Sequence, residues 1–180
     1  MQRTALVFLA LAGLCFPVAA QEFETVTRND LEITGQLDTA PALAFYRSDL
    51  FNTVDGSVLL HGLPVLTLLD GRRFPISSEL GRMGMSPLDL FPSAFLRAVE
   101  VQKVSSSPMH GTDAPGGVVD LRLNRDYSGG EMGVFYGKSG GRYGREDFQA
   151  YILGGVGNDK FHITAGAAYE ESSGHIPRGR

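Results

Sequence analysis

Apolar and polar side chains alternate with a period of two along much of the segment from residue 130 to residue 174. Apolar residues recur at every second position within 132–136, 148–152 and 161–169, and again at 156, with polar or small residues between most of them. This period places successive side chains on opposite faces of a β-strand, so we predict three antiparallel strands, with a tight turn at 157–159. Strands of about ten residues with aromatic ends fit an outer-membrane barrel. A soluble sheet with one wet face has the same period, and the pattern alone does not separate the two.

Shorter apolar runs between residues 21 and 124 predict a small mixed domain. Ser86, Pro87 and Asp89 form a helix-start signal, because a serine cap accepts a backbone hydrogen bond and proline fits the first helical position. Residues 41–50 fit neither the helical nor the strand period and stay unassigned. The predicted strands are 57–61, 65–69, 99–104 and 118–124; the first two lack alternation and are expected to be buried on both faces. The expected fold class is α+β: a mixed sheet with short helices, followed by about three antiparallel strands.

The first 20 residues have the pattern of a signal peptide. Arg3 precedes an apolar run from Ala5 to Phe16, and small residues lead to an expected cleavage site after Ala20. A membrane-spanning helix needs about 20 apolar residues, so this run is too short to cross a bilayer. Lipidation at Cys15 is the alternative, although Leu14 is bulky for a lipoprotein signal.

Composition excludes several classes of protein. The chain is 43% hydrophobic and carries a net charge of −4 without a basic cluster, so no nucleic-acid partner is expected. The single cysteine lies in the predicted signal peptide, and the four histidines lack metal-ligand spacing, so we expect no metal site and no cofactor. Residues 133–139 approach a phosphate-binding loop but are one residue short. We therefore predict that the protein is not an enzyme.

Four motifs in a fixed order give the chain a specific resemblance. Residues 58–121 resemble the plug domain of TonB-dependent outer-membrane receptors. The matching segments are Leu60-His61-Gly62, Leu68-Leu69-Asp70-Gly71-Arg72, Phe91-Pro92 followed by Val99-Glu100-Val101, and 110–121, which includes Gly111, Ala114, Gly116 and Gly117. The motif residues are expected to be structural, since Asp70-Gly71 is a tight-turn dipeptide and Gly116-Gly117 allows a sharp bend.

The resemblance implies a division of the chain and a function. It implies a signal peptide (1–20), an N-terminal extension (21–35), a plug (36–128) and partial barrel strands (129–180). Relatives in this family import siderophores, cobalamin or glycans across the outer membrane with energy from TonB, so a binding and gating role is expected. The family barrel has 22 strands and this sequence supplies about three, so we expect a truncated receptor that forms no pore alone. The alternative is a free periplasmic binding or interaction module with a plug-like fold.

Two candidate binding segments follow from the resemblance. Phe23, Glu24, Thr25, Val26 and Thr27 look like a TonB box, which a partner captures by strand addition; an ordinary leader strand is the alternative. Arg72, Arg73 and Arg82 are candidates for contact with an anionic ligand such as a metal chelate, against a simple role as solvated surface residues.

One departure from the family pattern bears on how the plug is held. The arginines that contact the barrel wall in the family are replaced by His61 and Ala98, which puts normal seating of the plug in doubt.

Overall fold

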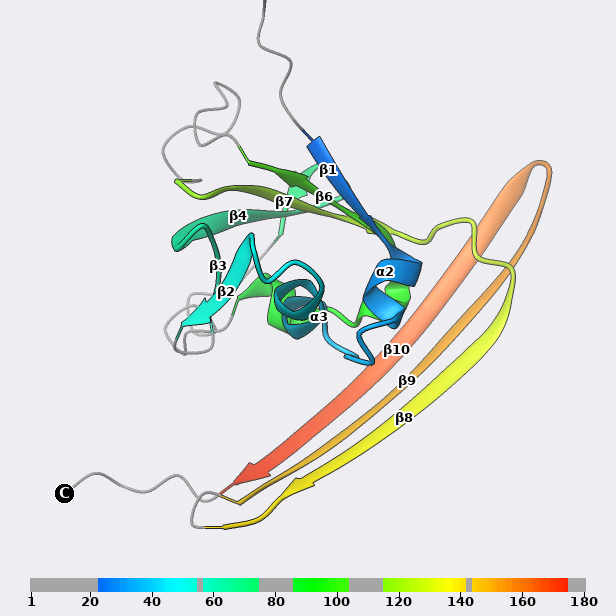
Figure 1. Ribbon diagram of the computed structural model, residues 1–180. Coiled ribbons are helices and arrows are strands. Elements are labelled where there is room, and N and C mark those ends of the chain that lie inside the picture. Colours follow the sequence, from blue (N-terminus) through cyan, green and yellow to red (C-terminus); the bar gives the residue numbers. More distant parts are fainter. Residues whose placement is uncertain (1–22, 55–56, 75–85, 104–114, 142–143, 175–180) are drawn as a thin grey trace, which may run out of the picture.

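The computed structural model describes residues 23–54, 57–74, 86–103, 115–141 and 144–174 and contains two sheets (Figure 1). The first is a seven-stranded mixed sheet with strand order β1-β6-β7-β4-β3-β2, in which β5 pairs with β4. The second is a three-stranded antiparallel sheet, β10-β9-β8, which we call the wall sheet. The α+β class and the three final strands are therefore as predicted. No helix within the described ranges is long and apolar enough to span a bilayer.

The seven strands of the first sheet come from three separate parts of the sequence. Only β4 and β7 run parallel, and the other pairs are antiparallel. The strands are β1 (Phe23–Thr27), β2 (Phe51–Val54), β3 (Ser57–Leu60), β4 (Leu63–Leu69), β5 (Arg72–Arg73), β6 (Leu96–Gln102) and β7 (Gly117–Leu123).

Two hairpins in this sheet turn through the dipeptides that the motifs contain. His61 and Gly62 join β3 to β4 with φ values of 50° and 78°, and Asp70 and Gly71 join β4 to β5 with φ values of 48° and 77°. Positive φ at both central residues defines the two-residue turn whose twist matches that of paired strands. The tight turn predicted at Asp70-Gly71 is present.

Short helices cover one face of the mixed sheet. They are α2 (Arg28–Glu32), α3 (Thr39–Tyr46), η2 (Pro87–Leu90) and η3 (Ser93–Phe95). The predicted start of η2 is correct: the Asp89 carboxylate accepts a hydrogen bond from the Ser86 amide at 2.8 Å, and Ser86 Oγ accepts one from the Leu88 amide. The core between helices and sheet is aliphatic, and its largest fully buried side chains include Phe51, Leu31, Leu43, Leu60, Leu88, Leu96 and Leu121. We call residues 23–123 the mixed-sheet domain.

The structure resolves one unassigned segment and corrects one expectation. Residues 41–50 contain most of α3. This helix buries Ala42 and Leu43, and its apolar residues do not form a regular stripe along one side. The expectation that strand 57–61 is buried on both faces was wrong, because burial alternates along β3: Val58 and Leu60 are buried, whereas Ser57 and Leu59 are half-buried.

The wall sheet consists of three long strands that curve around one side of the mixed-sheet domain (Figure 1). These strands are β8 (Gly129–Ser139), β9 (Arg145–Asn158) and β10 (Phe161–Gly174). Met132 lies opposite Ile152, which lies opposite Ala167, and Val156 lies opposite Ile163. Because partners across antiparallel strands share a face, the apolar series of the three strands merge into one surface.

Candidate functional site

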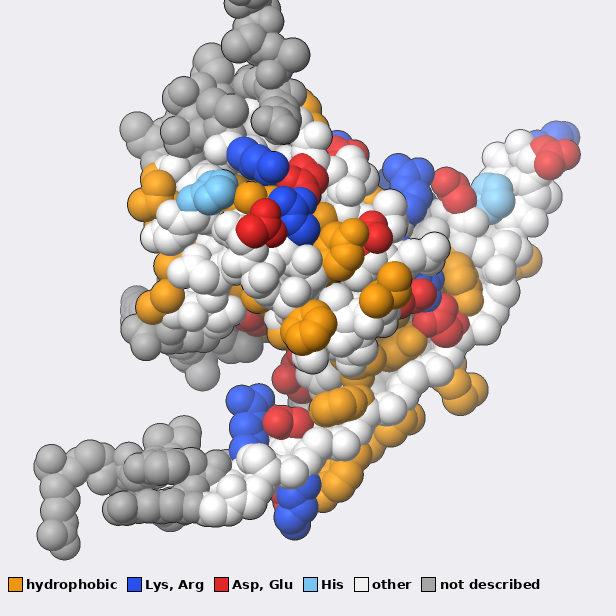
Figure 2. All heavy atoms as spheres, in the orientation of Figure 1, with side chains coloured by type: hydrophobic (Ala, Val, Ile, Leu, Met, Phe, Trp, Pro, Cys, Tyr) orange, Lys and Arg blue, Asp and Glu red, His pale blue; other side chains and the backbone are white. Residues whose placement is uncertain are grey.

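The two faces of the wall sheet have different environments. One face meets the mixed-sheet domain, and Leu153 on it is only 3% exposed. The opposite face carries large apolar side chains that are uncovered, with Met132 at 78%, Ile152 at 57% and Ile163 at 59% exposure. Figure 2 shows hydrophobic side chains following the outer side of this sheet. An exposed apolar surface of this kind marks a contact with a membrane or another protein.

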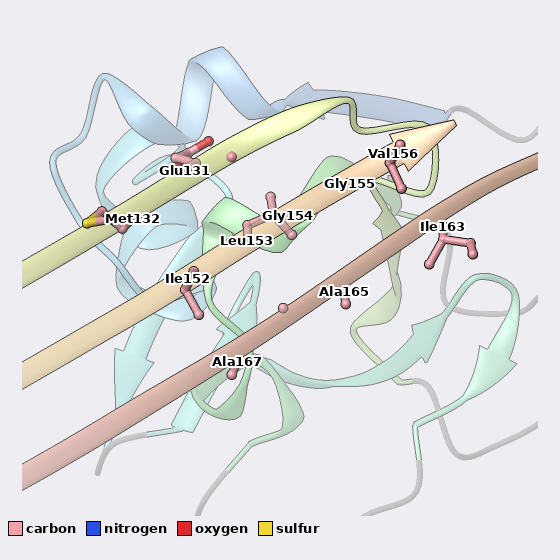
Figure 3. A pocket seen from close by; sticks show the side chains of 12 residues that line it. Glu131, Met132, Ile152, Leu153, Gly154, Gly155, Val156, Ile163, Ala165 and Ala167 are labelled. Carbon is pink, nitrogen blue, oxygen red and sulfur yellow. The ribbon is translucent and has the colours of Figure 1, made fainter. Parts of the chain in front are cut away.

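A shallow groove of about 840 Å³ lies on the wall sheet. Figure 3 shows Met132, Ile152, Val156 and Ile163 around the small residues Gly154, Ala165 and Ala167. The groove follows from the cross-strand register, because Gly130, Gly154 and Ala165 lie side by side on three adjacent strands. Its lining is almost entirely apolar, and among the residues that the structure describes Glu131 is the one ionisable residue that borders it.

Polar contacts join the mixed-sheet domain to the inner face of the wall sheet at Glu131. Arg28 Nη2 donates to Glu131 Oε2 at 2.5 Å, and Tyr151 Oη donates to Glu131 Oε1 at 2.7 Å. Burial alone raises the pKa of Glu131, but these hydrogen bonds and the charge of Arg28 outweigh it and lower that pKa. Burial and the neighbouring Glu131 carboxylate raise the pKa of Tyr151 to about 12. The carboxylate therefore stays ionised and holds Arg28 at neutral pH.

A second polar contact joins the two parts near the start of α3. Gln149 Nε2 donates to Asp38 Oδ2 at 2.6 Å, beside a cavity of about 430 Å³ between the mixed-sheet domain and the wall sheet. Burial raises the pKa of Asp38 to about 6; the Gln149 hydrogen bond opposes this rise, and nearby carboxylates at Asp89, Asp147 and Glu170 add to it. This part of the interface is acidic.

Aromatic rings fill the interface between these two polar contacts. Phe95 packs edge-on against Tyr151 with ring centroids 6.3 Å apart, and Phe91 packs edge-on against Phe95 at 6.2 Å. The Phe95 ring also lies on Gly166 of β10, where an added Cβ would be 2.9 Å from ring carbons. A side chain at position 166 would therefore force the Phe95 ring, or the part of the mixed-sheet domain that carries it, to move away from β10.

Several motif residues meet around the β4–β5 turn. Asp120 Oδ1 accepts a hydrogen bond from the Gly71 amide, and Asp70 Oδ1 accepts one from the Leu123 amide at 3.1 Å. Arg122 Nη2 lies 2.7 Å from Glu100 Oε2 and 3.2 Å from Asp120 Oδ2. Asp70 and Gly71 of the β4–β5 turn and Glu100 of β6, which the sequence motifs selected, are thus brought together, and Asp120 and Arg122 of β7 complete the network.

The paired glycines allow three strands to approach closely. A Cβ on Gly116 would lie 2.6 Å from the carbonyl oxygen of Leu63, and one on Gly117 would lie 2.3 Å from that of Gln102. Gly117 also has a φ of 129°, which side chains disfavour. Two other motif residues, Gly111 and Ala114, lie outside the described residues.

The five residues of the candidate TonB box form β1, an edge strand of the mixed sheet. Each pairs with a residue of β6, from Phe23 opposite Gln102 to Thr27 opposite Ala98. Val26 is buried in the core, whereas Phe23 is 58% exposed. Glu24 forms ion pairs with Arg47 and with Lys103. The segment is therefore extended, as strand addition requires, but one of its two edges is already paired within the chain.

The candidate ligand-facing arginines are only partly within the described residues. Arg72 and Arg73 form β5 and line a cavity of about 740 Å³ together with Asp70 and Arg125. Nε and Nη2 of Arg125 donate hydrogen bonds to Asp70 Oδ2 at 2.9 and 2.6 Å. Arg82 lies outside the described residues.

Sequence reasoning missed the residues that hold the mixed-sheet domain on the wall sheet. The alternation predicted that Gln149 and Tyr151 share the face opposite the apolar residues, which is where both lie. Nothing in the sequence pairs Gln149 with Asp38 or Glu131 with Arg28, because the partners are more than 100 positions apart. Arg28 supplies a cation to the wall sheet from a position outside the motif segments 60–62, 68–72, 91–101 and 110–121.

The combination of a mixed sheet and curved antiparallel strands packed against it is also found in solved receptor structures. Similar solved structures are a mutant of the ferric enterobactin receptor PfeA from Pseudomonas aeruginosa in complex with enterobactin (TM-score 0.59, 15% identity), the siderophore receptor PirA from Acinetobacter baumannii (0.56, 18%) and PirA from Pseudomonas aeruginosa (0.52, 16%). Each match covers 86% of this chain but only 25% to 29% of the receptor. The fold is that of the plug domain and first barrel strands of such receptors.

The family follows from the sequence match. The family described as TonB-dependent Receptor Plug Domain matches residues 19–118, which is more than half of the chain. The protein belongs to this family, and its mixed-sheet domain, called the plug from here on, is a TonB-dependent receptor plug.

Proposed function

We propose that the chain forms the plug and the first wall strands of an outer-membrane receptor that takes up a small molecule with energy from TonB. The observation that carries this proposal is the two-sided wall sheet. Its inner face holds the plug through Glu131, Gln149 and Tyr151, and its outer face presents apolar side chains. Lipid-facing strands of outer-membrane barrels alternate in this way. In this role the chain binds the small molecule and gates its passage, and no catalytic step is required of it.

For the ligand we propose an anionic metal chelate, such as a ferric siderophore. The support is the positive charge of Arg72 and Arg73, with Arg82 as a third candidate, and the similarity of fold to a receptor solved with enterobactin. The test is binding of a ferric catecholate to the full chain, measured by quenching of tyrosine fluorescence. Replacement of Arg72 and Arg73 by alanine should weaken binding at least tenfold, and the same replacement at exposed Arg97 should not.

For the periplasmic partner we propose TonB, and for its docking segment β1. The support is the position of β1 at the sheet edge, where a second strand can add on the side that no described strand of the sheet pairs with. A cysteine at Thr25, which is exposed, should form a disulfide with cysteine-substituted TonB, and a cysteine at exposed Thr53 on β2 should not. Equal cross-linking at both positions would contradict docking at β1.

Membrane residence is tested by fractionating cells that export the full chain. Ile152→Arg places a charge on the outer face of the wall sheet, where it costs about 2–4 kcal/mol if that face lies near the middle of a bilayer. The matched control is Thr53→Arg, which adds the same charge at an exposed site of the plug. The proposal predicts that the unchanged chain and the control are recovered in outer membranes after a urea wash, and that Ile152→Arg reduces this recovery. Recovery of all three in the soluble periplasm would support the free periplasmic module instead.

A further inference from the structure

The groove on the outer face of the wall sheet runs across the strands rather than along them. Its floor is formed by Gly130, Gly154 and Ala165, which lie side by side on β8, β9 and β10. Rows of larger apolar side chains border this floor on both sides, as Figure 3 shows for Met132, Ile152, Val156 and Ile163. The volume of about 840 Å³ lies within the range of roughly 300–1,000 Å³ that small-molecule sites occupy.

The floor of the groove is open space. A Cβ added to Gly130 or to Gly154 would meet nothing within 4 Å. The bordering side chains are uncovered, with Met132 at 78% and Val156 at 65% exposure. A slender hydrocarbon chain in the groove gains dispersion contacts with the floor and with both borders, which a flat face does not offer. The shape fits an acyl chain, and the charges nearby indicate the rest of the ligand.

The connection between β9 and β10 places a lysine at the end of the wall sheet nearest the groove. Asn158 Oδ1 accepts hydrogen bonds from the amides of Lys160 at 2.9 Å and Phe161 at 3.1 Å, which fixes this turn. Val156 and Ile163 lie two residues along the strands from the Asn158–Phe161 pair, a distance of about 7 Å. The long stem of Lys160 can therefore bring its ammonium to the headgroup of a lipid whose chain occupies the groove.

Lys160 differs from two other cations of the wall sheet in its lack of an ionic partner. Lys138 pairs with Glu146 at the other end of the sheet, and Arg145 pairs there with an aspartate on its own strand. Among the residues that the structure describes, none forms an ion pair with Lys160. A phosphate group is an anion that its ammonium can bind by charge-assisted hydrogen bonds.

The lengths of the two connections orient the wall sheet in the proposed membrane setting. Residues 159–160 join β9 to β10, whereas residues 140–144 join β8 to β9 at the opposite end of the sheet (Figure 1). Outer-membrane barrels have short turns on the periplasmic side and longer loops on the extracellular side. In this setting the groove and Lys160 belong to the periplasmic half of the membrane.

We propose that the groove binds one acyl chain of a glycerophospholipid from the periplasmic leaflet, and that Lys160 binds the phosphate of the same molecule. The proposal rests on the proposed function, because the outer face has to lie in a membrane. It goes beyond that function by assigning a defined lipid site to one part of this face.

The experiment is native mass spectrometry of the purified full chain in detergent micelles, titrated with dipalmitoyl phosphatidylglycerol. The measured quantity is the dissociation constant of the first bound lipid. Gly154→Leu fills the groove from an open position and should weaken binding at least about tenfold, since the chain then loses its contacts with the floor. The matched control is Gly140→Leu, which adds the same side chain at another open position outside the groove and should leave binding unchanged.

A second pair of variants tests the phosphate contact. Lys160→Gln should weaken binding of phosphatidylglycerol about tenfold, because a charge-assisted hydrogen bond is lost. Binding of dipalmitoylglycerol, which has the same chains without the phosphate, should be equal in this variant and in the unchanged chain. Lys138→Gln removes a cation from the other end of the wall sheet and should leave the binding of both lipids unchanged.

Three results would overturn the proposal. The first is equal phosphatidylglycerol binding by Gly154→Leu and Gly140→Leu, and the second is an equal effect of Lys160→Gln on both lipids. The third is a groove that packs against a second copy of the chain, in which case Gly154→Leu lowers the fraction of dimer in the same spectra without changing lipid binding. Recovery of the chain in outer membranes does not depend on any of these results, so failure of this site is distinguishable from failure of the proposed function.

Discussion

The Asp120 carboxylate on β7 accepts a hydrogen bond of 3.0 Å from the backbone amide of Gly71, which lies 49 residues earlier in the chain. Asp120 is 7% exposed, and it faces Glu100 of β6 across the sheet. Its other oxygen lies 3.2 Å from the Arg122 guanidinium. Two motifs that are distant in sequence are therefore joined at one turn, which fixes the end of β4 relative to β7.

Removal of this acceptor should destabilise the plug. Asp120→Ala leaves the Gly71 amide without its partner and is expected to reduce the free energy of unfolding by about 1–3 kcal/mol. Asp120→Asn keeps an acceptor and should cost less. Urea denaturation followed by circular dichroism measures both. If asparagine and alanine are equally harmful, the hydrogen bond to Gly71 is not the reason for an aspartate at position 120.

The close approach at Gly116 gives a second prediction. Gly116→Ala places a Cβ 2.6 Å from the Leu63 carbonyl oxygen and 2.9 Å from that of Pro64, so the backbone has to shift. The expected loss in unfolding free energy is at least about 2 kcal/mol, within the range for overpacking. The matched control is Gly130→Ala, where a Cβ meets nothing within 4 Å. Equal stability of the two variants in urea would contradict the close approach of β4 and β7.

The pH dependence of stability follows from Asp38. Its pKa is raised from the ordinary value of 3.8 to about 6 in the folded chain, chiefly by burial. Protonation therefore favours the folded state: the stabilisation is fully present below about pH 4 and is lost as the pH rises through about 6. Asp38→Asn removes this dependence.

The measurement for Asp38 is the difference in unfolding free energy between the unchanged chain and Asp38→Asn at pH 5 and at pH 7.5. After allowance for partial solvent exposure, the variant should gain about 1–2 kcal/mol relative to the unchanged chain between these two pH values. Asp89→Asn is a useful comparison, because burial also raises the pKa of that residue. A difference for Asp38→Asn that does not change with pH would contradict a buried, protonatable Asp38.

The Phe95 ring and Gly166 give a prediction for the fit between plug and wall sheet. Gly166→Val places branched carbons where ring carbons already lie, and the plug should be displaced from β10. Limited proteolysis should then cleave the segment near Arg125, whose carbonyl oxygen bonds Thr164 in the intact structure, faster than in the unchanged chain. Gly154→Ala, whose added Cβ meets nothing within 4 Å, should leave the cleavage rate unchanged. Equal rates for both variants would contradict the contact.

The local elements of this fold were largely predictable from the sequence. The period of two defined the faces of β8 to β10, and the Asp70-Gly71 and Ser86 to Asp89 signals act over three or four residues, so neighbouring residues determine them. The helix α3 was not predictable, because its apolar residues surround it without a stripe and only the packed core shows its orientation. The plug seating was not predictable either, since Arg28 and Asp38 meet partners more than 100 residues away.

The central claim is that the outer face of the wall sheet contacts lipid while the plug covers its inner face. A direct measurement places a fluorescent label on a cysteine at Ile152 or, as a control, at exposed Asn52 of β2, in membranes that contain the full chain. We predict that brominated lipids quench the label at position 152 and that aqueous iodide does not, with the reverse result at position 52. Quenching of both labels by iodide, and of neither by brominated lipid, would contradict the account.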